Sequence, residues 1–199
     1  MFARAPLAGR VKTRLVPRLG ADGAARLHAR LIRNAVRTAI AARCGTVELH
    51  ATARHTLFST LGVKVRLQRG RDLGERMHHA LRSALGRHRR AILIGADAPA
   101  LTPADLRRAR RLLQSTDLVL APAEDGGYAL VGARRLSLHI FTDVGWGSDA
   151  VLAQTLRNLA RTRLRYRLLR TVWDVDRPAD LDRLRDELAQ LVHSYGGER

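Results

Sequence analysis

The stretch Ala91-Ile92-Leu93-Ile94-Gly95-Ala96-Asp97 decides the fold, because an apolar run ends there in a single carboxylate. Consecutive apolar residues without polar alternation are typical of a strand covered on both faces, as in a parallel sheet between two layers of helices. Ligands of open α/β sheets bind beyond the carboxyl ends of the strands. The stretch therefore predicts a central, buried parallel strand with Asp97 facing a ligand crevice.

Strand and helix patterns alternate on both sides of this stretch. Helical periodicity and capping residues predict helices over residues 22–43 and 73–85, and from Thr102, about Ser148 and Pro178. Strands are expected over residues 46–51, 63–67, 117–122, 128–132 and 164–169. The turn between 117–122 and 128–132 is too short for a crossover helix, so these strands pair as a hairpin or splay apart. The succession predicts a three-layer α/β/α fold around a doubly wound, mostly parallel but mixed sheet.

Length and composition favour a cytoplasmic protein of one domain. The chain has 199 residues, which predicts a single domain over 1–199. Hydrophobic residues make up 46% of it, yet no apolar run approaches the roughly 18 residues that a membrane helix needs, so we expect no membrane span. The start lacks the apolar stretch of a secretory signal. Cys44 is the only cysteine, which excludes a disulfide within the chain and favours the cytoplasm.

The net charge of +18 is almost entirely arginine, since Lys12 and Lys64 are the only lysines. Such a charge attracts anionic partners, but it says little about the fold. The arginines are spread over nearly every expected helix, as on an ordinary solvated surface. A noncatalytic nucleic-acid-binding protein is therefore a low-ranked alternative, and we find no recognition helix or RNA-binding motif that would support it.

Two segments carry groups suited to phosphate binding. Residues 6–15 combine Gly9, Lys12 and Arg14; glycine lets the backbone approach a phosphate, and the cations neutralise it. The glycine spacing is not that of a Walker loop, and an ordinary basic loop is the alternative interpretation. Residues 68–77 place two glycines and several charges before a helix, whose free amides bind anions or bases. This second segment is alternatively a polar connection.

Three further segments carry carboxylates. Asp97 follows the buried strand, and Mg²⁺ and Mn²⁺ prefer oxygen ligands of this kind. Asp174 and Asp176 alternate with Val175, so both point to the same side of an extended segment and can approach one cation. The acids of Glu124-Asp125-Gly126-Gly127-Tyr128 can deprotonate an incoming hydroxyl. Tight turns and helix caps are ordinary roles for all of these acids.

In this order, the segments resemble a bacterial transferase family found beside radical-SAM and selenodomain genes. That family is assigned to the glycosyltransferase-A-like enzymes of the nucleotide-diphospho-sugar transferase superfamily. The matching stretches cover nearly the whole chain: residues 2–15, 73–77, 94–101, 122–128 and 174–176. The family has an apolar strand before its first motif, where this chain has Met1 and Phe2 only. It often has lysine at the place of Arg4 and threonine at the place of Arg177.

The resemblance implies the nucleotide-diphospho-sugar transferase fold and a metal-dependent transferase with a small-molecule acceptor. The nucleotide site it implies consists of Ala5, Pro6, Gly9, Lys12, Arg14, Leu73, Gly74, Glu75 and Asp97. It implies Mg²⁺ or Mn²⁺ as cofactor, held by Asp97 and Asp176. The implied acceptor site consists of Glu124, Asp125, Gly126, Gly127, Tyr128 and Trp146, although a core role suits Trp146 equally well. The implied catalytic residues are Lys12, Glu124 and Asp125, with Asp125 as the base.

The leading functional hypothesis is glycosyl transfer from a nucleotide sugar. The alternative keeps the site and changes the reaction to nucleotidyl transfer from a nucleoside triphosphate onto a phosphorylated small molecule, with release of pyrophosphate. Both reactions present phosphates to the same cations of residues 9–14. The sequence does not predict the nucleobase, the sugar, the acceptor or the oligomeric state.

Overall fold

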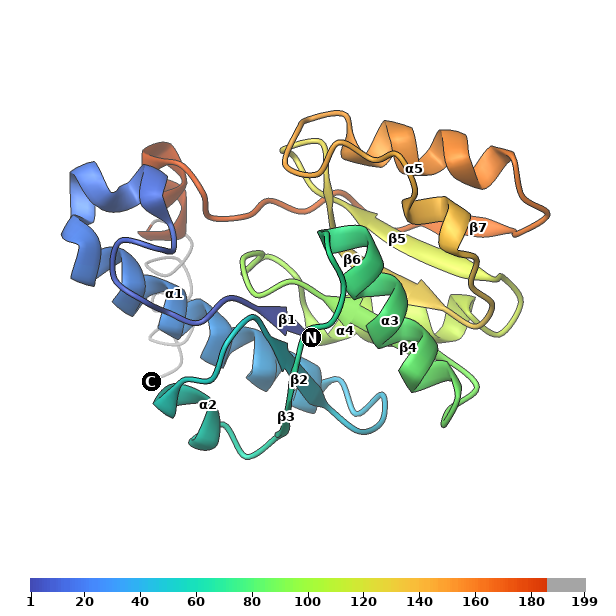
Figure 1. Cartoon of the computed structure of the whole chain (residues 1–199), viewed down its shortest axis with the longest axis horizontal. Coiled ribbons are helices and arrows are strands. Elements are labelled where there is room, and N and C mark those ends of the chain that lie inside the picture. Colours follow the sequence, from blue (N-terminus) through green and yellow to red (C-terminus); the bar gives the residue numbers. More distant parts are fainter. Residues whose placement is uncertain (186–199) are drawn as a thin grey trace, which may run out of the picture.

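The computed structural model describes residues 1–185, which form an α/β fold (Figure 1). The strands are β1 (Phe2–Ala3), β2 (Glu48–Ala51), β3 (Lys64–Leu67), β4 (Ala91–Ile94), β5 (Leu118–Pro122), β6 (Tyr128–Ala133) and β7 (Tyr166–Leu168). The helices are η1 (Thr13–Leu15), α1 (Val16–Ala41), α2 (Thr56–Ser59), α3 (Leu73–Leu85), α4 (Pro103–Leu112), η2 (Leu138–Phe141) and α5 (Val151–Ala160). The helix expected from Pro178 is seen over residues 178–185, and its predicted continuation lies outside the described residues.

Hydrogen bonds divide the strands into two sheets. One has the order β1-β2-β3 with parallel neighbours, and the other has the order β4-β6-β5-β7. In the second sheet β6 is antiparallel to β4 and β5, while β7 is parallel to β5. The mixed character is confirmed, and β5 and β6 form a hairpin. The prediction that residues 91–95 form a central parallel strand is wrong, because the ladder of β4 within residues 1–185 runs antiparallel to β6 alone.

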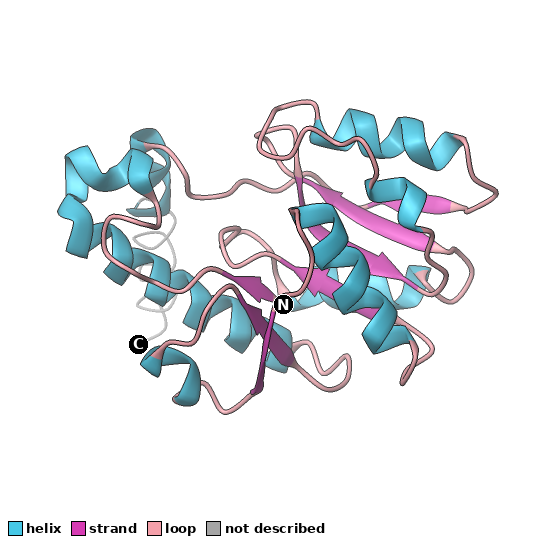
Figure 2. Ribbon diagram, viewed as in Figure 1, coloured by secondary structure: helices cyan, strands magenta, loops and turns pink. Residues whose placement is uncertain are grey.

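Two hydrophobic clusters explain why β4 shows no polar alternation. Leu93 belongs to the cluster that includes side chains of α3 and α5, whereas Ile94 belongs to the cluster that includes α1, α2 and α4. Phe2 and Ala3 of β1 divide between the same two clusters, so both sheets lie between the same two helical layers. The helices cover both faces of the strands (Figure 2), and the three-layer α/β/α prediction is confirmed.

Helix α1 starts earlier than the pattern over 22–43 predicts. Its first turns contain Pro17 near the start and Gly20 with non-helical angles of φ 70° and ψ 166°, and these residues hide the helical periodicity. The buried face of α1 is otherwise apolar but includes His28. No helix within residues 1–185 combines the length and the apolar character that crossing a membrane requires.

A third cluster joins α1 to the segment that follows β7. Leu15 packs with Trp173 and Val175, all of them buried. Arg18 of α1 donates to both carboxylate oxygens of Asp182 over 3.0 and 2.8 Å. This packing carries the acid-bearing residues 174–176 to the start of α1, beside the first basic loop.

Candidate functional site

Three segments that are distant in sequence meet beyond the carboxyl ends of β1 and β4. The Lys12 Nζ atom lies 2.9 Å from Asp97 Oδ1 and 3.9 Å from Asp176 Oδ1. Arg14 contacts the other oxygen of Asp176 over 2.5 Å. The Val175 N–H donates to the Asp97 carbonyl over 2.9 Å and ties the two acid-bearing segments together. The cations of the first loop and both proposed metal ligands therefore lie together where the sequence predicted a ligand crevice, and we call this place the cleft.

Lys12 is held in an unusual backbone conformation. Its φ of 48° and ψ of 42° lie in the left-handed region, which is uncommon for residues other than glycine and is often found at functional sites. Gly9, in the same loop, also has a positive φ of 73°. The Lys12 side chain is only 6% exposed, whereas that of Arg14 is 61% exposed. The loop thus directs one buried ammonium group at the acids and leaves Arg14 at the surface.

The start of this loop is anchored in the first sheet. Ala5 and Pro6 are buried, and the Ala5 N–H donates to the Thr52 hydroxyl over 3.2 Å. These two residues therefore seat the loop on β2 and leave the residues from Gly9 onward to approach a ligand.

Asp97 is ionised at neutral pH and only partly covered. Its Oδ1 atom is buried, yet 44% of the side-chain surface is exposed, so the exposure belongs to the rest of the carboxylate side chain. Burial opposes ionisation, but the proximity of His28 and the charge of Lys12 outweigh it and lower the pKa of Asp97 to about 2. His28 was not among the residues predicted from the sequence, although an imidazole on the apolar face of a helix was a signal for it.

Asp174 also lies near these charges, although the metal site implied by the resemblance consisted of Asp97 and Asp176 only. Burial raises its pKa to about 6, and the charges of Asp125, Asp176 and Asp97 act in the same direction against that of Lys12. Carboxylates gathered in this way favour binding a proton or a cation, because either relieves their mutual repulsion. The alternation with Asp176 was visible in sequence, but the burial was not.

These acids fit a divalent cation that is shared with a phosphate ligand. Mg²⁺ usually takes one or two carboxylates together with substrate phosphates and does not require a cage made entirely of protein. The buried Oδ1 of Asp97 pairs with Lys12 Nζ, while the rest of the carboxylate side chain is partly exposed and can approach a cation. Within the same residues, no three His, Cys, Asp or Glu side chains are arranged to hold a metal by themselves. The donor set is therefore suited to a cation that a bound nucleotide helps to coordinate.

The predicted nucleoside-binding residues form the first turn of α3. Asp72 caps this helix by accepting the Glu75 N–H over 2.8 Å. Hydrogen bonds from the Arg71 guanidinium and backbone lower the pKa of Glu75 to about 2. Leu73 is 41% exposed and offers an apolar surface at the helix start.

Trp146 and Tyr128 pack close to that first turn. A Cβ atom at Gly74 would lie 2.8 Å from Trp146 Cζ2, so glycine is needed for this contact. The Trp146 ring also lies edge-on to Tyr128, with 6.5 Å between centroids. Burial raises the pKa of Tyr128 and outweighs the opposite effect of the neighbouring Thr155 side chain. Both rings therefore have packing roles, and their contact with an acceptor stays a prediction.

The other acceptor residues form the turn between β5 and β6. The Asp125 carboxylate accepts the Gly127 N–H over 2.9 Å, as in an ordinary tight turn. Gly126 has a φ of 86°, and a Cβ there would meet the Asp149 carbonyl oxygen at 1.9 Å, so no other residue fits. Glu124 pairs with Arg183 over 2.9 Å. The turn is thus well defined, and its role toward an acceptor stays a prediction.

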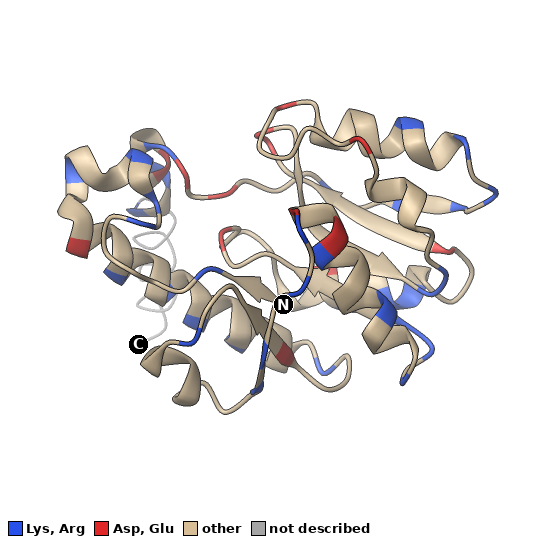
Figure 3. Ribbon diagram, in the orientation of Figure 1, with Lys and Arg blue, Asp and Glu red and all other residues tan. Residues whose placement is uncertain are grey.

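The charged residues are distributed differently by sign. Acidic positions occur along the extended segment after β7 and in the loops near it, and also on α1, α3 and β2, whereas Lys and Arg occur on α1, α3, α4 and α5 and in many loops (Figure 3). The spread of the arginines agrees with the solvated-surface interpretation of the net charge.

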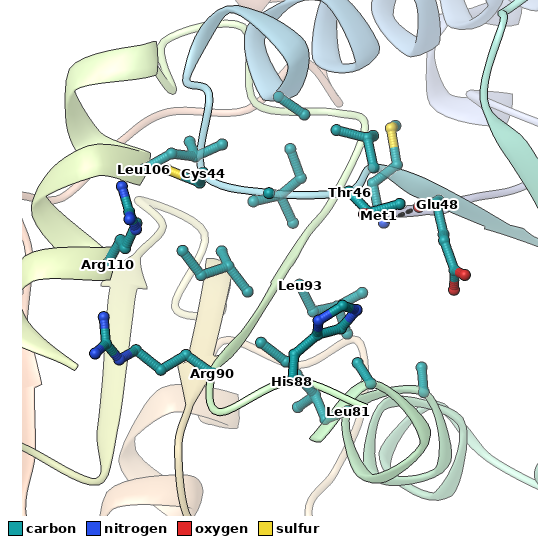
Figure 4. A pocket seen from close by; sticks show the side chains of 18 of the residues that line it. Met1, Cys44, Thr46, Glu48, Leu81, His88, Arg90, Leu93, Leu106 and Arg110 are labelled. Atoms are coloured by element: carbon teal, nitrogen blue, oxygen red, sulfur yellow. Dashed lines mark hydrogen bonds between the residues drawn. The ribbon is translucent and has the colours of Figure 1, made fainter. Parts of the chain in front are cut away.

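A separate cavity of about 390 Å³ lies at the amino ends of β2 and β4 (Figure 4). Apolar side chains of α3 and β4, including Leu81 and Leu93, line it. Met1, residues 44–48, Arg90 and Arg110 also line it. Neither Lys12 nor any acid of the cleft is among its lining residues. The cavity is therefore distinct from the site at the carboxyl ends of the strands.

Similar structures support the fold. A crystal structure from Desulfovibrio desulfuricans G20, described as a "putative nucleotide-diphospho-sugar transferase", is 31% identical with a TM-score of 0.81, over 88% of this chain and 80% of that one. CMP:2-keto-3-deoxy-manno-octonic acid synthetase complexed with CTP is 13% identical with a TM-score of 0.63, over 95% and 96%. The manganese complex of Rv0371C from Mycobacterium tuberculosis H37Rv is 20% identical with a TM-score of 0.54, over 92% and 95%. The expected nucleotide-diphospho-sugar transferase-like fold is confirmed.

No protein of curated function matches the chain in sequence. The association with radical-SAM and selenodomain genes stays a prediction. A family model matches residues 24–148, more than half of the chain. The chain therefore belongs to the family described as "Uncharacterized protein conserved in bacteria (DUF2064)".

Proposed function

We propose that this protein is a metal-dependent transferase that moves a glycosyl group from a nucleotide sugar to a small-molecule acceptor. One observation carries the proposal: a nearly buried ammonium group, Lys12 Nζ, faces both Asp97 and Asp176 in one cleft beyond the strand ends. A cation beside two carboxylates is suited to a diphosphate that arrives with its own divalent metal. Similarity to the D. desulfuricans protein supports the class of donor.

The residues of the cleft divide into phosphate, metal and nucleoside groups. Lys12 and Arg14 contact the diphosphate oxygens, and Asp97 and Asp176 hold Mg²⁺ or Mn²⁺. The metal would neutralise the diphosphate and make it a better leaving group. The exposed surface of Leu73 and the free amides at the start of α3 receive the nucleoside.

The transfer step breaks the bond between the anomeric carbon and the phosphate oxygen. The electron pair of that bond stays on the nucleoside diphosphate, where Lys12 stabilises the added charge. The acceptor oxygen bonds to the anomeric carbon, and its proton passes to Asp125 as base. Glu124, Gly126, Gly127, Tyr128 and Trp146 line the acceptor side.

Nucleotidyl transfer is a second candidate, and one comparison favours it. The synthetase that binds CTP shares the fold over 96% of its length. In this reaction Lys12 and Arg14 contact a triphosphate, a phosphate oxygen of the second substrate bonds to the α-phosphorus, and pyrophosphate leaves. We further propose that residues 1–199 act as one domain, because a chain of 199 residues has the size of one domain. We also propose a cytoplasmic location, because Cys44 is the only cysteine.

A thermal-shift panel of nucleotide sugars and nucleoside triphosphates, each with and without Mg²⁺ or Mn²⁺, tests the proposal. A ligand that binds only the native state raises the melting temperature. We expect a metal-dependent rise in the wild type and none in Asp97→Ala. An equal rise in both proteins would show that Asp97 binds no metal.

Product analysis with the stabilising ligand then separates the reactions. Release of nucleoside diphosphate indicates glycosyl transfer, and release of pyrophosphate indicates nucleotidyl transfer. A nucleic-acid-binding protein would instead bind oligonucleotides equally well after Asp97→Ala, with an affinity that falls steeply as salt increases.

A further inference from the structure

The cavity lies in a gap between the two sheets. Both sheets lie between the same helical layers, but within residues 1–185 no strand pairing joins β1 to β4. Residues 44–48 border the cavity on the side of β2, and residues 91–94 border it on the side of β4. Leu106 of α4 and Leu81 of α3 come from the two helical layers and close its faces (Figure 4). The cavity therefore has the surroundings of one strand in a three-layer fold.

The short strand β1 is aligned with this cavity. It runs parallel to β2, with Phe2 opposite His50. The same register places the three positions before Met1 opposite residues 46–48, which line the cavity. At about 3.3 Å per residue, three residues in a strand span about 10 Å. A continuation of β1 would therefore run through the cavity alongside β2.

The edge of β4 that borders the cavity carries backbone groups with no strand partner among the described residues. In an antiparallel ladder, alternate residues bond to the partner strand, and the residues between them direct N–H and C=O to the other side. The Gly95 N–H donates to the Ala129 carbonyl of β6 over 3.0 Å, which sets the alternation. Ile92 and Ile94 are thus directed away from β6, and both line the cavity. A strand in the cavity would pair with β4 as well as with β2.

The Met1 amino group is poorly suited to its position in the lining of the cavity. Its nitrogen donates to the Glu48 carbonyl over 2.6 Å. Burial lowers the pKa of this amino group to about 5, against the attraction of the Glu48 charge, so the charged form is disfavoured. A peptide N–H in its place would donate the same hydrogen bond without a charge. These surroundings suit the interior of a strand better than a free amino group.

We infer that the cavity receives an extended, apolar polypeptide segment joined to the Met1 nitrogen, which lengthens β1 and links the two sheets into one. Strands between two helical layers are apolar on both faces, and Leu81, Leu93 and Leu106 give the cavity matching walls. A small apolar ligand would fill the same volume but leave the edge of β4 unpaired. The inference does not depend on the proposed reaction, although β1 leads into the loop of Lys12 and a longer β1 would hold that loop to both sheets.

The test compares two extensions placed directly before Met1 of the full-length chain. One is Val-Val-Val and the other is Thr-Thr-Thr; both residues are β-branched and favour strands, but threonine carries a hydroxyl group. Hydrogen exchange of the Ile92 amide, followed by NMR, reports pairing along β4. The amide of Leu120 in β5 is the reference, because its exchange changes only with the stability of the whole fold. Urea unfolding measures that stability.

We expect the valine extension to slow exchange at Ile92 at least about tenfold relative to Leu120. It should also lower the equilibrium constant of unfolding at least about tenfold, because three apolar side chains are removed from water. The threonine extension should do much less, because its hydroxyl groups would be buried without partners. If the valine extension gives no soluble protein, Ala-Ala-Ala against Ser-Ser-Ser makes the same comparison.

Three results would overturn the inference. Equal exchange and equal stability for the two extensions would place the segment outside the cavity. Protection of Ile92 that rises with protein concentration would show that the strand pairs with a second copy of the chain. Ala84→Leu places a larger side chain in the cavity, so its stabilising effect and that of the valine extension should be less than additive. Full additivity would show that the two do not share one space.

Discussion

The two ends of β4 open onto regions of opposite character. The carboxyl end leads to the cleft, where Lys12 faces Asp97 and Asp176. The amino end borders the cavity between β2 and β4, whose lining is a mixture of apolar side chains and surface arginines (Figure 4). The cavity also has titratable groups in its lining, among them the Met1 amino group, Glu48 and His50. The cleft differs in that the ammonium group of Lys12 lies between carboxylates from two distant segments.

The acids of the cleft lower the stability of the ligand-free fold but allow it to bind a cation, whereas the cavity is a space that side chains do not fill. The pKa of Asp174 is raised to about 6 by burial and by three neighbouring acids, so these charges destabilise the ligand-free fold at neutral pH. A bound cation would relieve that repulsion. Substitutions in the cleft should accordingly change ligand binding more than stability, and substitutions around the cavity should do the reverse.

The largest effect is expected from Lys12→Met. Removal of the ammonium leaves Asp97 Oδ1 buried without a cation and the neighbouring acids unbalanced. We expect about 100-fold weaker binding of the stabilising nucleotide by calorimetry, equivalent to about 3 kcal/mol. The free energy of unfolding should fall by about 1–3 kcal/mol, the cost of an unsatisfied buried polar group. Lys64→Met at exposed Lys64 of β3 is the matched control, and equal losses in the two variants would contradict the role of Lys12.

The next effect concerns His50, which lines the cavity. Burial, together with the nearby amino group of Met1, lowers the pKa of His50 to about 4 against the attraction of Glu48. Between about pH 6.5 and pH 4 the unfolded chain binds a proton that the folded chain does not, so stability falls as pH falls through this window. From pH 7 to pH 5 the free energy of unfolding should drop on the order of 1 kcal/mol more in the wild type than in His50→Gln. Urea titrations at each pH measure this difference, and parallel pH profiles would refute it.

A smaller gain is expected from filling the cavity with Ala84→Leu. Ala84 of α3 lines the cavity, and leucine is nearly as good a helix former as alanine. Cavity-filling changes of this kind commonly add about 0.5–1 kcal/mol, which raises the melting temperature by roughly 1–4 °C in a chain of this size. Ala109→Leu is the contrasting variant, because Ala109 is fully buried in α4 and overpacking there should lower stability by about 1–3 kcal/mol. Nucleotide binding by Ala84→Leu should stay unchanged.

The sequence predicted those features that depend on local pattern and on the strand-end rule. Both bounds of α3 were predicted, because Asp72 caps a regular apolar periodicity. The strand-end rule placed Asp97 at the ligand crevice, and the resemblance to the transferase family implied that Lys12 and Asp176 join it there. Whether the strand that pairs with β4 runs parallel or antiparallel to it was not predictable, because an apolar run shows only that both faces of a strand are covered.

The sequence did not predict the roles of residues whose partners are distant along the chain. A lone histidine on the inner face of α1 reads as a core residue, and only the fold shows that His28 reaches Arg4 and Asp97. Asp174 was recognised as alternating with Asp176, but part of its raised pKa comes from Asp125, which lies in another turn. Such tertiary electrostatics leave no periodic signal in a single sequence.

The smallest effect on stability is expected from Arg14→Ala. This variant tests whether the exposed Arg14–Asp176 pair and the buried Lys12–Asp97 pair stabilise the fold independently. Arg14 contacts Asp176 over 2.5 Å, but its side chain is 61% exposed. Exposed ion pairs contribute about 0–1 kcal/mol, so the free energy of unfolding should fall by about 0.5 kcal/mol or less. If Arg14 also contacts a phosphate, nucleotide affinity should fall by about tenfold and depend less on salt than in the wild type. Calorimetry at low and high salt measures both quantities. A stability loss as large as that of Lys12→Met would mean that the surface pair and the buried pair act together, and that burial does not separate their roles.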